Sequence, residues 1–137
     1  PQTYCGKKTA DFAGQKSDRQ LKGDGDPLDI CVFTEREIPH GDILVEVNVI
    51  GGMRMIDGGE ADDKIIAVLA QDEVYDFNDI KQAPERLVNR LKHYFLTYKQ
   101  LPGGGHTECE ITHIYGCEEA KKVVQLSIQD YKDKFPD

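Results

Sequence analysis

Short runs of β-branched and other apolar residues fill the first half of the chain, and they limit its fold more than any other feature. Each run is bounded by glycine or proline, which is typical of strands. A shorter alternating stretch, MRMI at 53–56, is a candidate for a fourth strand. The three longer runs, which we predict to be strands, are Leu28–Thr34, Ile43–Ile50 and Ile65–Ala70.

The apolar pattern becomes helical after Pro84, a residue type that is favoured at the start of a helix. A second helix is predicted from about Cys117 to Tyr131, and the glycine-rich stretch at 102–105 predicts a loop between the two. Strands followed by helices indicate the α+β class, with helices packed on a sheet or a small barrel. The residues that follow Pro84 at helical spacing are Leu87, Leu91, Tyr94, Phe95 and Tyr98.

The chain has 137 residues, of which 39% are hydrophobic, and this is enough apolar material for the core of one domain. We therefore treat residues 1–137 as a single domain. The formal net charge of −8 argues against general binding to nucleic acids or anionic membranes. No apolar run reaches the length of a bilayer span, and no secretory signal is visible. We expect a cytoplasmic protein that binds neither nucleic acid nor membrane.

Three aspartates lie close together in the stretch GDGDPLD at 23–29, which opens the first predicted strand. Asp24 and Asp26 are two residues apart, so in an extended chain they project to the same side. Such close carboxylates repel one another unless a cation lies between them, and Mg²⁺ and Mn²⁺ prefer oxygen ligands. If this stretch is considered alone, a solvated acidic turn that binds no metal ion explains it as well as a metal site does. An EF-hand calcium loop does not fit, because Asp29 stands where that loop needs glycine.

A second acidic stretch, DGGEADDK at 57–64, joins the MRMI segment to the third long strand. Its paired glycines permit a tight hairpin bend. If the first and third long strands are neighbours, both acidic stretches meet at one end of the sheet and surround one cavity. Lys64 would then lie among the carboxylates as a cation for a polyanionic ligand. This combination predicts metal-assisted phosphoryl transfer to water, with one carboxylate accepting the proton of the water.

Four ordered stretches resemble the signature of the soluble family I inorganic pyrophosphatases. They are DGDPLD at 24–29 followed by an apolar strand, GGMRMID and DDKIIAV at 51–57 and 62–68, and HYFLTYK at 93–99. The resemblance covers most of residues 23–99 and, more loosely, the C-terminal helix. It implies an OB-like five-stranded β-barrel with flanking C-terminal helices. It also implies hydrolysis of inorganic diphosphate to two phosphates with several Mg²⁺ ions, or with Mn²⁺ or other divalent ions in their place.

The resemblance further implies a role for each motif residue. Asp24, Asp29 and Asp62 match ligands of the first metal ion, and Asp29 also bridges to the second. Asp57, together with Asp62, matches ligands of the ions that accompany the substrate. Asp26 resembles the general base that acts on the metal-bridging water. The residues that match substrate-contacting positions are Tyr4, Lys64, Tyr98 and Lys99.

Several of these residues also have purely structural explanations. Tyr98 lies on the apolar face of its helix, where periodicity alone favours a place in the core. Lys99 can stabilise the C-terminus of that helix. His93 is either a surface residue or, as in hexameric bacterial members, part of a subunit interface, and we expect a homo-oligomer, a hexamer or a dimer. Asp63 and Glu60 have no firm counterpart in the family and are interpreted as solvated charges.

Two features depart from the family pattern. Members carry a segment before Tyr4 whose Lys, Glu and Arg hold phosphate and metal, so we expect the chain to be part of a longer polypeptide and to lack its N-terminal segment here. The link between Tyr4 and Asp24 is longer than in simple bacterial members, and we interpret 5–22 as a basic surface loop, with a cover over the acidic cavity as the alternative. An inactive scaffold that only binds metal or oligomerises stays open as a second hypothesis. Hydrolysis of organic diphosphates is disfavoured, because no Trp is present to bind a base.

Overall fold

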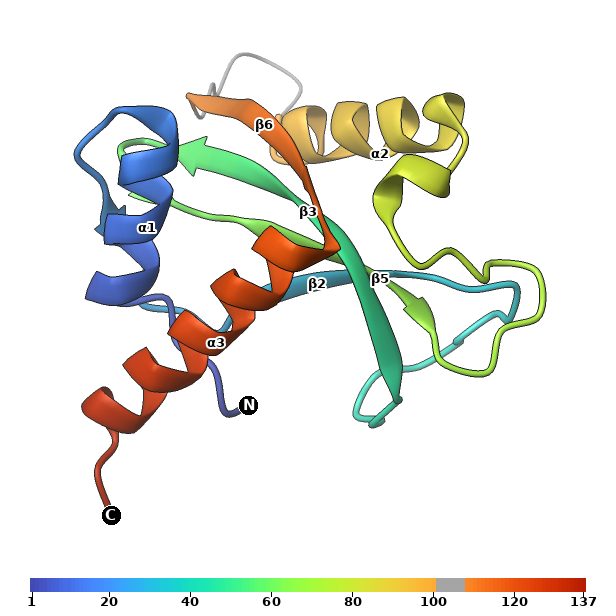
Figure 1. The fold of residues 1–137 in the computed structure, drawn as a ribbon, viewed down its shortest axis with the longest axis horizontal. Helices are drawn as coiled ribbons and strands as arrows, with labels where there is room; N and C mark the ends of the chain where they lie inside the picture. Colours follow the sequence, from blue (N-terminus) through green and yellow to red (C-terminus); the bar gives the residue numbers. More distant parts are fainter. Residues whose placement is uncertain (101–107) are drawn as a thin grey trace.

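A computed structural model describes residues 1–100 and 108–137 of the chain. The loop predicted at 102–105 lies outside the described residues. Figure 1 shows a curled sheet, like half of a barrel, with helices packed around it. The predicted α+β class and OB-like architecture are confirmed.

The sheet contains six strands within the described ranges and is centred on one long strand, β3. The strands are β1 (Lys22–Gly23), β2 (Asp29–Phe33), β3 (Val47–Asp57), β4 (Glu60–Ala61), β5 (Lys64–Leu69) and β6 (Cys109–Gly116). β3 pairs antiparallel with β4, β5 and β6, whereas β1 pairs with β4, and β2 with β5, in parallel. The first and third long strands of the sequence analysis, now β2 and β5, are therefore neighbours.

The parallel pairing explains why the two acidic stretches meet. The register pairs Gly23 with Ala61, then resumes at Asp29 and Lys64. Between these pairs the chain leaves the sheet at two places, residues 24–28 between β1 and β2 and residues 62–63 between β4 and β5. Because the interruptions are at the same level of neighbouring strands, their carboxylates lie at one place on the sheet.

Two segments that were predicted as separate strands, Ile43–Ile50 and Met53–Ile56, belong to one strand. Gly51 and Gly52, which suggested a break, stay in β3 because other residues pack directly on their backbone. A Cβ atom on Gly51 would lie 2.6 Å from the carbonyl oxygen of Tyr115, and one on Gly52 would lie 2.5 Å from the Tyr115 ring. The first four residues of the former segment are exposed and lie outside β3.

Both predicted helices are confirmed. α2 spans Glu85–Thr97, directly after Pro84, and follows a short 3-10 helix, η1 (Ile80–Gln82). α3 spans Cys117–Lys134 and begins where β6 ends. Over residues 1–100 and 108–137, no helix combines the length and the apolar character that crossing a membrane requires.

The interpretation of 5–22 as a surface loop is wrong, because this stretch contains a third helix, α1 (Lys7–Ser17). α1 lies beside α3 (Figure 1) and packs against the sheet at Ala61. Large apolar side chains on its inner face would have produced the periodic signal that revealed the other helices. The buried residues are small or polar instead: Thr9, Ala10, Ala13 and Gly14.

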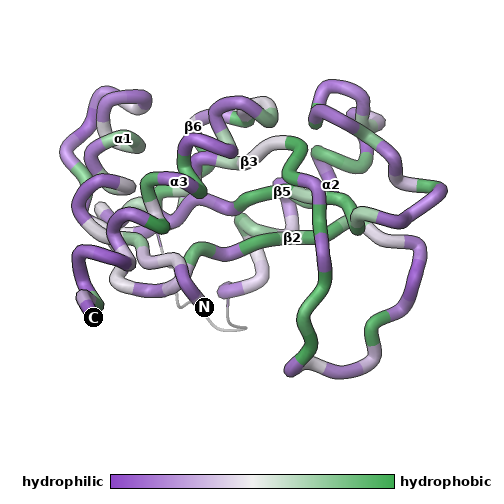
Figure 2. Tube along the Cα trace, turned by 60° about the horizontal axis from the view of Figure 1, so that its bottom comes forward, coloured by the Kyte–Doolittle hydropathy of each residue, from purple (hydrophilic) through white to green (hydrophobic). Residues whose placement is uncertain are grey.

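The sheet separates two hydrophobic clusters, and Figure 2 shows hydrophobic residues gathered along β5 and β2. Side chains alternate along a strand, so Ile66 of β5 packs toward α2 whereas Ile65 packs toward α3. The cluster next to α2 contains Ile50, Ile66, Val68, Ile80, Leu91 and Phe95. The cluster next to α3 contains Ile65, Tyr115, Ala120, Val123 and Phe12. The same alternation places Lys64 and Asp63, the charged residues that precede Ile65, on opposite faces of the sheet.

Candidate active site

Lys64 connects the two acidic stretches. It is the first residue of β5 and is only 3% exposed, and its Nζ lies 2.5 Å from Oδ2 of Asp29 and 2.8 Å from Oδ1 of Asp62. Burial alone would lower the pKa of Lys64, but its hydrogen bonds to the two carboxylates outweigh this effect and raise the pKa. Lys64 is therefore charged, and it holds a carboxylate from each stretch to one ammonium group.

A second lysine reaches the carboxylates from the end of α2. Lys99 follows this helix, and its Nζ lies 3.0 Å from Oδ2 of Asp57, the last residue of β3, and 3.9 Å from Oδ2 of Asp62. The hydrogen bond to Asp57 raises the pKa of Lys99. Because the Lys99 side chain is partly exposed, water screens this ion pair, and Asp57 can exchange it for another cation at little cost.

Asp24 and Asp26 are the carboxylates of the site that have no basic partner among the described residues. Burial raises the pKa of Asp24 to about 6, and the nearby carboxylates of Asp62 and Asp26 also raise it, against a hydrogen bond from the Asp26 N–H at 2.9 Å. The tight turn between them requires Gly25, whose φ is 76°. Asp26 itself is exposed. The raised pKa of Asp24 thus reflects its burial first, and the negative charge of its neighbours second.

The donor set suits a hard divalent cation. Within the described ranges, no three His, Cys, Asp or Glu side chains form a ready-made metal group. Lysines engage three of the four predicted metal ligands, Asp29, Asp57 and Asp62. Carboxylate oxygens are nevertheless the ligands that Mg²⁺ and Mn²⁺ prefer, and the unneutralised Asp24 lies against Asp62. The residues that can hold such ions are Asp24, Asp29, Asp57 and Asp62.

A surface pocket of about 220 Å³ opens beside the pair formed by Lys64 and Asp29. Tyr98 lines this pocket, is 45% exposed and stacks on Tyr94 with ring centroids 5.3 Å apart. The interpretation of Tyr98 as a core residue is therefore wrong. The Lys64 ammonium group also lies 6.0 Å from the centroid of the Phe95 ring. Together these residues form an aromatic wall next to a buried cation.

Tyr4 reaches the site from another direction. Its ring packs edge-on against Phe135 at 6.0 Å and lies beneath the ammonium group of Lys134. A Cβ atom on Gly25 would lie 3.5 Å from the Tyr4 hydroxyl oxygen. Tyr4 therefore touches the turn that carries Asp24 and not the pocket lined by Tyr98, and its contact with substrate stays a prediction.

The sequence analysis missed a buried charged network on the opposite face of the sheet. Arg54 and Asp63 are 1% and 3% exposed, and their Nη2 and Oδ2 atoms lie 3.1 Å apart. The Tyr115 hydroxyl donates a hydrogen bond to the same oxygen at 2.7 Å, and Arg54 Nη1 donates one to Glu119 at 2.8 Å. The interpretation of Asp63 as a solvated charge is thus wrong, whereas Glu60 is indeed exposed.

This network lies directly behind the site because of strand alternation. Asp62 and Lys64 lie on the face of the sheet that carries Asp29, whereas Asp63 between them points to the opposite face, where it meets Arg54 and Tyr115. The signal for it was present in the MRMI stretch, where Arg54 interrupts an otherwise apolar run. A charged residue at that position needs a buried partner, and the nearest acidic stretch provides one.

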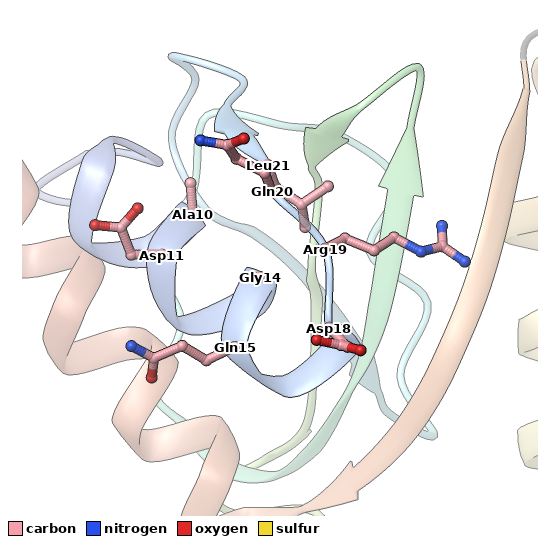
Figure 3. A pocket seen from close by; sticks show the side chains of 8 residues that line it. All are labelled: Ala10, Asp11, Gly14, Gln15, Asp18, Arg19, Gln20 and Leu21. Atoms are coloured by element: carbon pink, nitrogen blue, oxygen red, sulfur yellow. The ribbon is translucent and has the colours of Figure 1, made fainter.

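A wider hollow of about 490 Å³ lies elsewhere, between α1 and the segment 18–21 (Figure 3). Figure 3 shows Asp11, Gln15 and Asp18 around it. None of the predicted site residues lines this hollow. It is therefore not part of the candidate active site.

Comparison with known proteins identifies relatives across nearly the whole chain. A family model described as inorganic pyrophosphatase matches residues 1–132. The inorganic pyrophosphatase of Chlamydia caviae is 49% identical over 141 residues, which cover 98% of this chain and 65% of that protein. Soluble inorganic pyrophosphatase 2 of Chlamydomonas reinhardtii is 40% identical, over 85% of this chain and 59% of that protein.

Solved structures agree with these sequence relatives. The inorganic pyrophosphatase from Thermus thermophilus superposes with a TM-score of 0.72 at 34% identity, covering 80% of this chain and 63% of that one. The type I inorganic pyrophosphatase from Toxoplasma gondii gives a TM-score of 0.77 at 26% identity, covering 98% and 59%. The chain thus spans between 59% and 65% of the length of these four relatives. By the extent of the family match and by its identity to these proteins, the chain belongs to the inorganic pyrophosphatase family, as its ordered motifs predict.

Proposed function

We propose that the chain hydrolyses inorganic diphosphate to two phosphate ions in a reaction that requires Mg²⁺, with Mn²⁺ as a second suitable ion. The observation that carries this proposal is the convergence of both acidic stretches on Lys64, which has Asp29 and Asp62 within 2.8 Å of its Nζ. Carboxylates and lysines in one place suit a polyanionic substrate that arrives with divalent cations. Membership of the inorganic pyrophosphatase family supports the same substrate.

We infer that the divalent cations are held by Asp24, Asp29, Asp57 and Asp62. When bound, such cations neutralise phosphate oxygens and lower the pKa of a coordinated water molecule. Asp24 already carries uncompensated charge, and the screened pair between Asp57 and Lys99 costs little to open. The Asp29 side chain is 61% exposed, so it can turn from Lys64 toward a cation without a change in the backbone.

The same exchange frees the two lysines for substrate. A lysine ammonium group is a compact charge with three hydrogen-bond donors, and it suits phosphate oxygens. Lys64 and Lys99 would leave their carboxylates for the substrate once other cations replace them there. Tyr98 lines the same pocket as Lys64, which supports its proposed contact with the same phosphate group. Tyr4 remains a predicted contact on the side of the turn at Gly25.

Asp26 is the proposed proton acceptor for the attacking water. Its carboxylate is exposed, and no basic side chain in the described part of the chain pairs with it. Its N–H donates a hydrogen bond to the carboxylate of Asp24 at 2.9 Å, so Asp26 lies beside the inferred cation sites. A carboxylate that is not fully committed to a cation can take a proton from water in the transition state.

Phosphate release from diphosphate, measured with and without Mg²⁺, tests the proposal. We expect turnover that depends on Mg²⁺, and Asp26→Asn should lower kcat by about 10²–10⁴-fold, the range for loss of a general base. Asp18→Asn is the matched control, because Asp18 has a φ of 55°, which asparagine tolerates, and takes no part in the site. Intact Mg²⁺ binding without turnover in the unsubstituted chain would contradict the proposal and favour the inactive scaffold. Full activity of Asp26→Asn would remove Asp26 from its role.

The homo-oligomer and the cytoplasmic location remain predictions. His93 is exposed on α2, as both a surface residue and an interface residue would be in a single chain. Sedimentation of the chain and of His93→Ala would distinguish them, because only an interface residue changes the oligomeric state.

A further inference from the structure

Asp130 of α3 holds the beginning of α1. It is 5% exposed, and its Oδ2 accepts hydrogen bonds from the N–H groups of Gly6 and Thr9, at 3.1 and 2.9 Å, and from the Thr9 hydroxyl at 2.8 Å. Its Oδ1 accepts a hydrogen bond from the N–H of Lys8 at 3.0 Å. The first N–H groups of a helix have no partner within the helix, and Gly6 at the capping position has no side chain to supply one. A distant residue of another helix therefore caps α1.

The segment before α1 is bonded in turn to the acidic turn of the site. The N–H of Cys5 donates a hydrogen bond to the carbonyl oxygen of Asp26 at 2.9 Å, and the N–H of Gly25 donates one to the carbonyl oxygen of Cys5 at 3.1 Å. A Cβ atom on Gly23 would lie 2.1 Å from that same Cys5 oxygen. The contact is thus backbone against backbone, with no side chain between that can absorb a shift.

A second bond ties the same segment to α3, since the N–H of Tyr4 donates to the carbonyl oxygen of Ser127 at 3.0 Å. Residues 4–6 therefore lie between α3 on one side and the turn 24–26 on the other. Their place relative to α3 is set by this bond and by the bond from Gly6 to Asp130, and the three bonds from Lys8 and Thr9 hold the first turn of α1 that follows them. Any displacement of Gly6 is passed to Asp26 and Gly25 through Cys5.

We propose that Asp130 is a positioning residue for the candidate active site. By capping α1 it fixes residues 4–6, and through them it fixes the backbone of the turn that carries Asp24 and Asp26. The catalytic consequence rests on the proposed function, whereas the mechanical link does not. Lys64 is the first residue of β5 and Lys99 follows the end of α2, so both lie outside this link.

Asp133 provides a matched control on the same helix. Its carboxylate lies 2.5 Å from Nζ of Lys8, so it also joins α3 to α1, but through an exposed side-chain pair. Asp133→Ala removes one cross-helix contact without removing an acceptor from the helix cap. Asp130→Ala removes all four accepted hydrogen bonds, and Asp130→Asn retains one acceptor oxygen.

Amide hydrogen exchange of the metal-free chain tests the mechanical link. We expect Asp130→Ala to accelerate exchange at the N–H groups of Cys5 and Gly25 by about tenfold or more, because their bonds depend on the position of residues 4–6. Asp130→Asn should give a smaller increase, and Asp133→Ala should give none. If Asp130→Ala does not fold, Thr9→Val removes the hydroxyl bond alone and should show the same pattern more weakly. Unchanged exchange at Cys5 and Gly25 would overturn the proposal.

Kinetics with diphosphate and Mg²⁺ test the catalytic consequence. Asp130→Ala should lower kcat by about 10–100-fold, as expected for a displaced catalytic group, and raise the Mg²⁺ concentration at half-maximal rate. KM for diphosphate should rise by a smaller factor than kcat falls, since Lys64 and Lys99 keep their positions and only Tyr4 among the predicted substrate contacts lies in the displaced segment. Loss of thermal stability with unchanged kcat, or an equal loss of kcat in Asp133→Ala, would make Asp130 merely structural. If the unsubstituted chain has no activity, the proposed function fails, and the exchange data alone decide whether Asp130 positions the turn at 24–26.

Discussion

The buried pair formed by Arg54 and Asp63 allows a quantitative prediction about stability. Substitution Asp63→Asn removes a negative charge from a position that is 3% exposed, next to a guanidinium group that is 1% exposed. The volume of the side chain is nearly unchanged, so no cavity contributes to the result. The cost comes from leaving Arg54 buried with one partner fewer.

The magnitude follows from the contacts. Loss of one partner of a buried pair costs about 3–5 kcal/mol. Here the lower value applies, because Arg54 keeps its hydrogen bond to Glu119, whose side chain is 24% exposed and therefore reached by water. Moreover, Oδ1 of Asp63 has no hydrogen-bond partner, so only the two bonds of Oδ2 are at stake. We therefore expect Asp63→Asn to lower the free energy of unfolding by about 3 kcal/mol.

A double-mutant cycle isolates the pair. Arg54→Met should cost a similar amount, because it leaves the Asp63 carboxylate buried without its cation, and burial already raises the pKa of Asp63. The double variant should cost less than the sum of the two by about 2–3 kcal/mol, since each substitution removes the partner that the other leaves stranded.

Urea unfolding followed by circular dichroism measures all four proteins at one pH. Lys7→Ala is the control, because the ion pair of Lys7 with Asp11 is exposed and should contribute nothing measurable. Additive losses in the double variant would refute the reasoning, and so would an Asp63→Asn variant as stable as the unsubstituted chain.

Two further predictions concern the ion pair of Lys99 with Asp57 and the hydrogen bonds of Asp72. Lys99→Met should raise KM for diphosphate by about 10–100-fold, which corresponds to the loss of one charged hydrogen bond. It should also tighten Mg²⁺ binding to the free chain, because the substitution releases Asp57. An unchanged KM would exclude Lys99 from the substrate site. Asp72 accepts hydrogen bonds from the N–H groups of Tyr75 and Glu35, among others, which lower its pKa from 3.8 to about 2. This stabilisation is present above about pH 4 and is lost as the pH falls toward about 2, so the difference in unfolding free energy between the unsubstituted chain and Asp72→Asn should narrow between about pH 4 and pH 2 in urea titrations. A constant difference would contradict this linkage.

Most of the cluster formed by Lys64, Lys99 and the carboxylates that they bind could be predicted from the sequence. Asp29 and Lys64 each begin a β-branched run, and parallel pairing of those runs brings their first residues together. Periodicity after Pro84 likewise located α2 and hence Lys99. These predictions succeeded because period and turn chemistry are local properties that the backbone must obey.

The features that sequence reasoning missed depend on contacts between distant segments. α1 buries alanine and glycine, which have no strong periodic signal, and its cap comes from Asp130 far along the chain. Asp63 looks like its solvated neighbour Glu60 until Arg54 is placed opposite it. The helical period predicts a place in the core for Tyr98, but α2 ends at Thr97 and Tyr98 is 45% exposed. Local patterns do not contain these partners.

The convergence of the two acidic stretches on one cation site is tested most directly by Mg²⁺ binding to four proteins. Calorimetric titration compares the unsubstituted chain with Asp24→Asn from the first stretch, Asp62→Asn from the second, and the double variant. If both residues serve the same site, each single substitution weakens binding, and the double variant loses less than the sum of the two by at least about 1 kcal/mol. Additive losses, or single variants that bind Mg²⁺ as the unsubstituted chain does, would contradict a shared site.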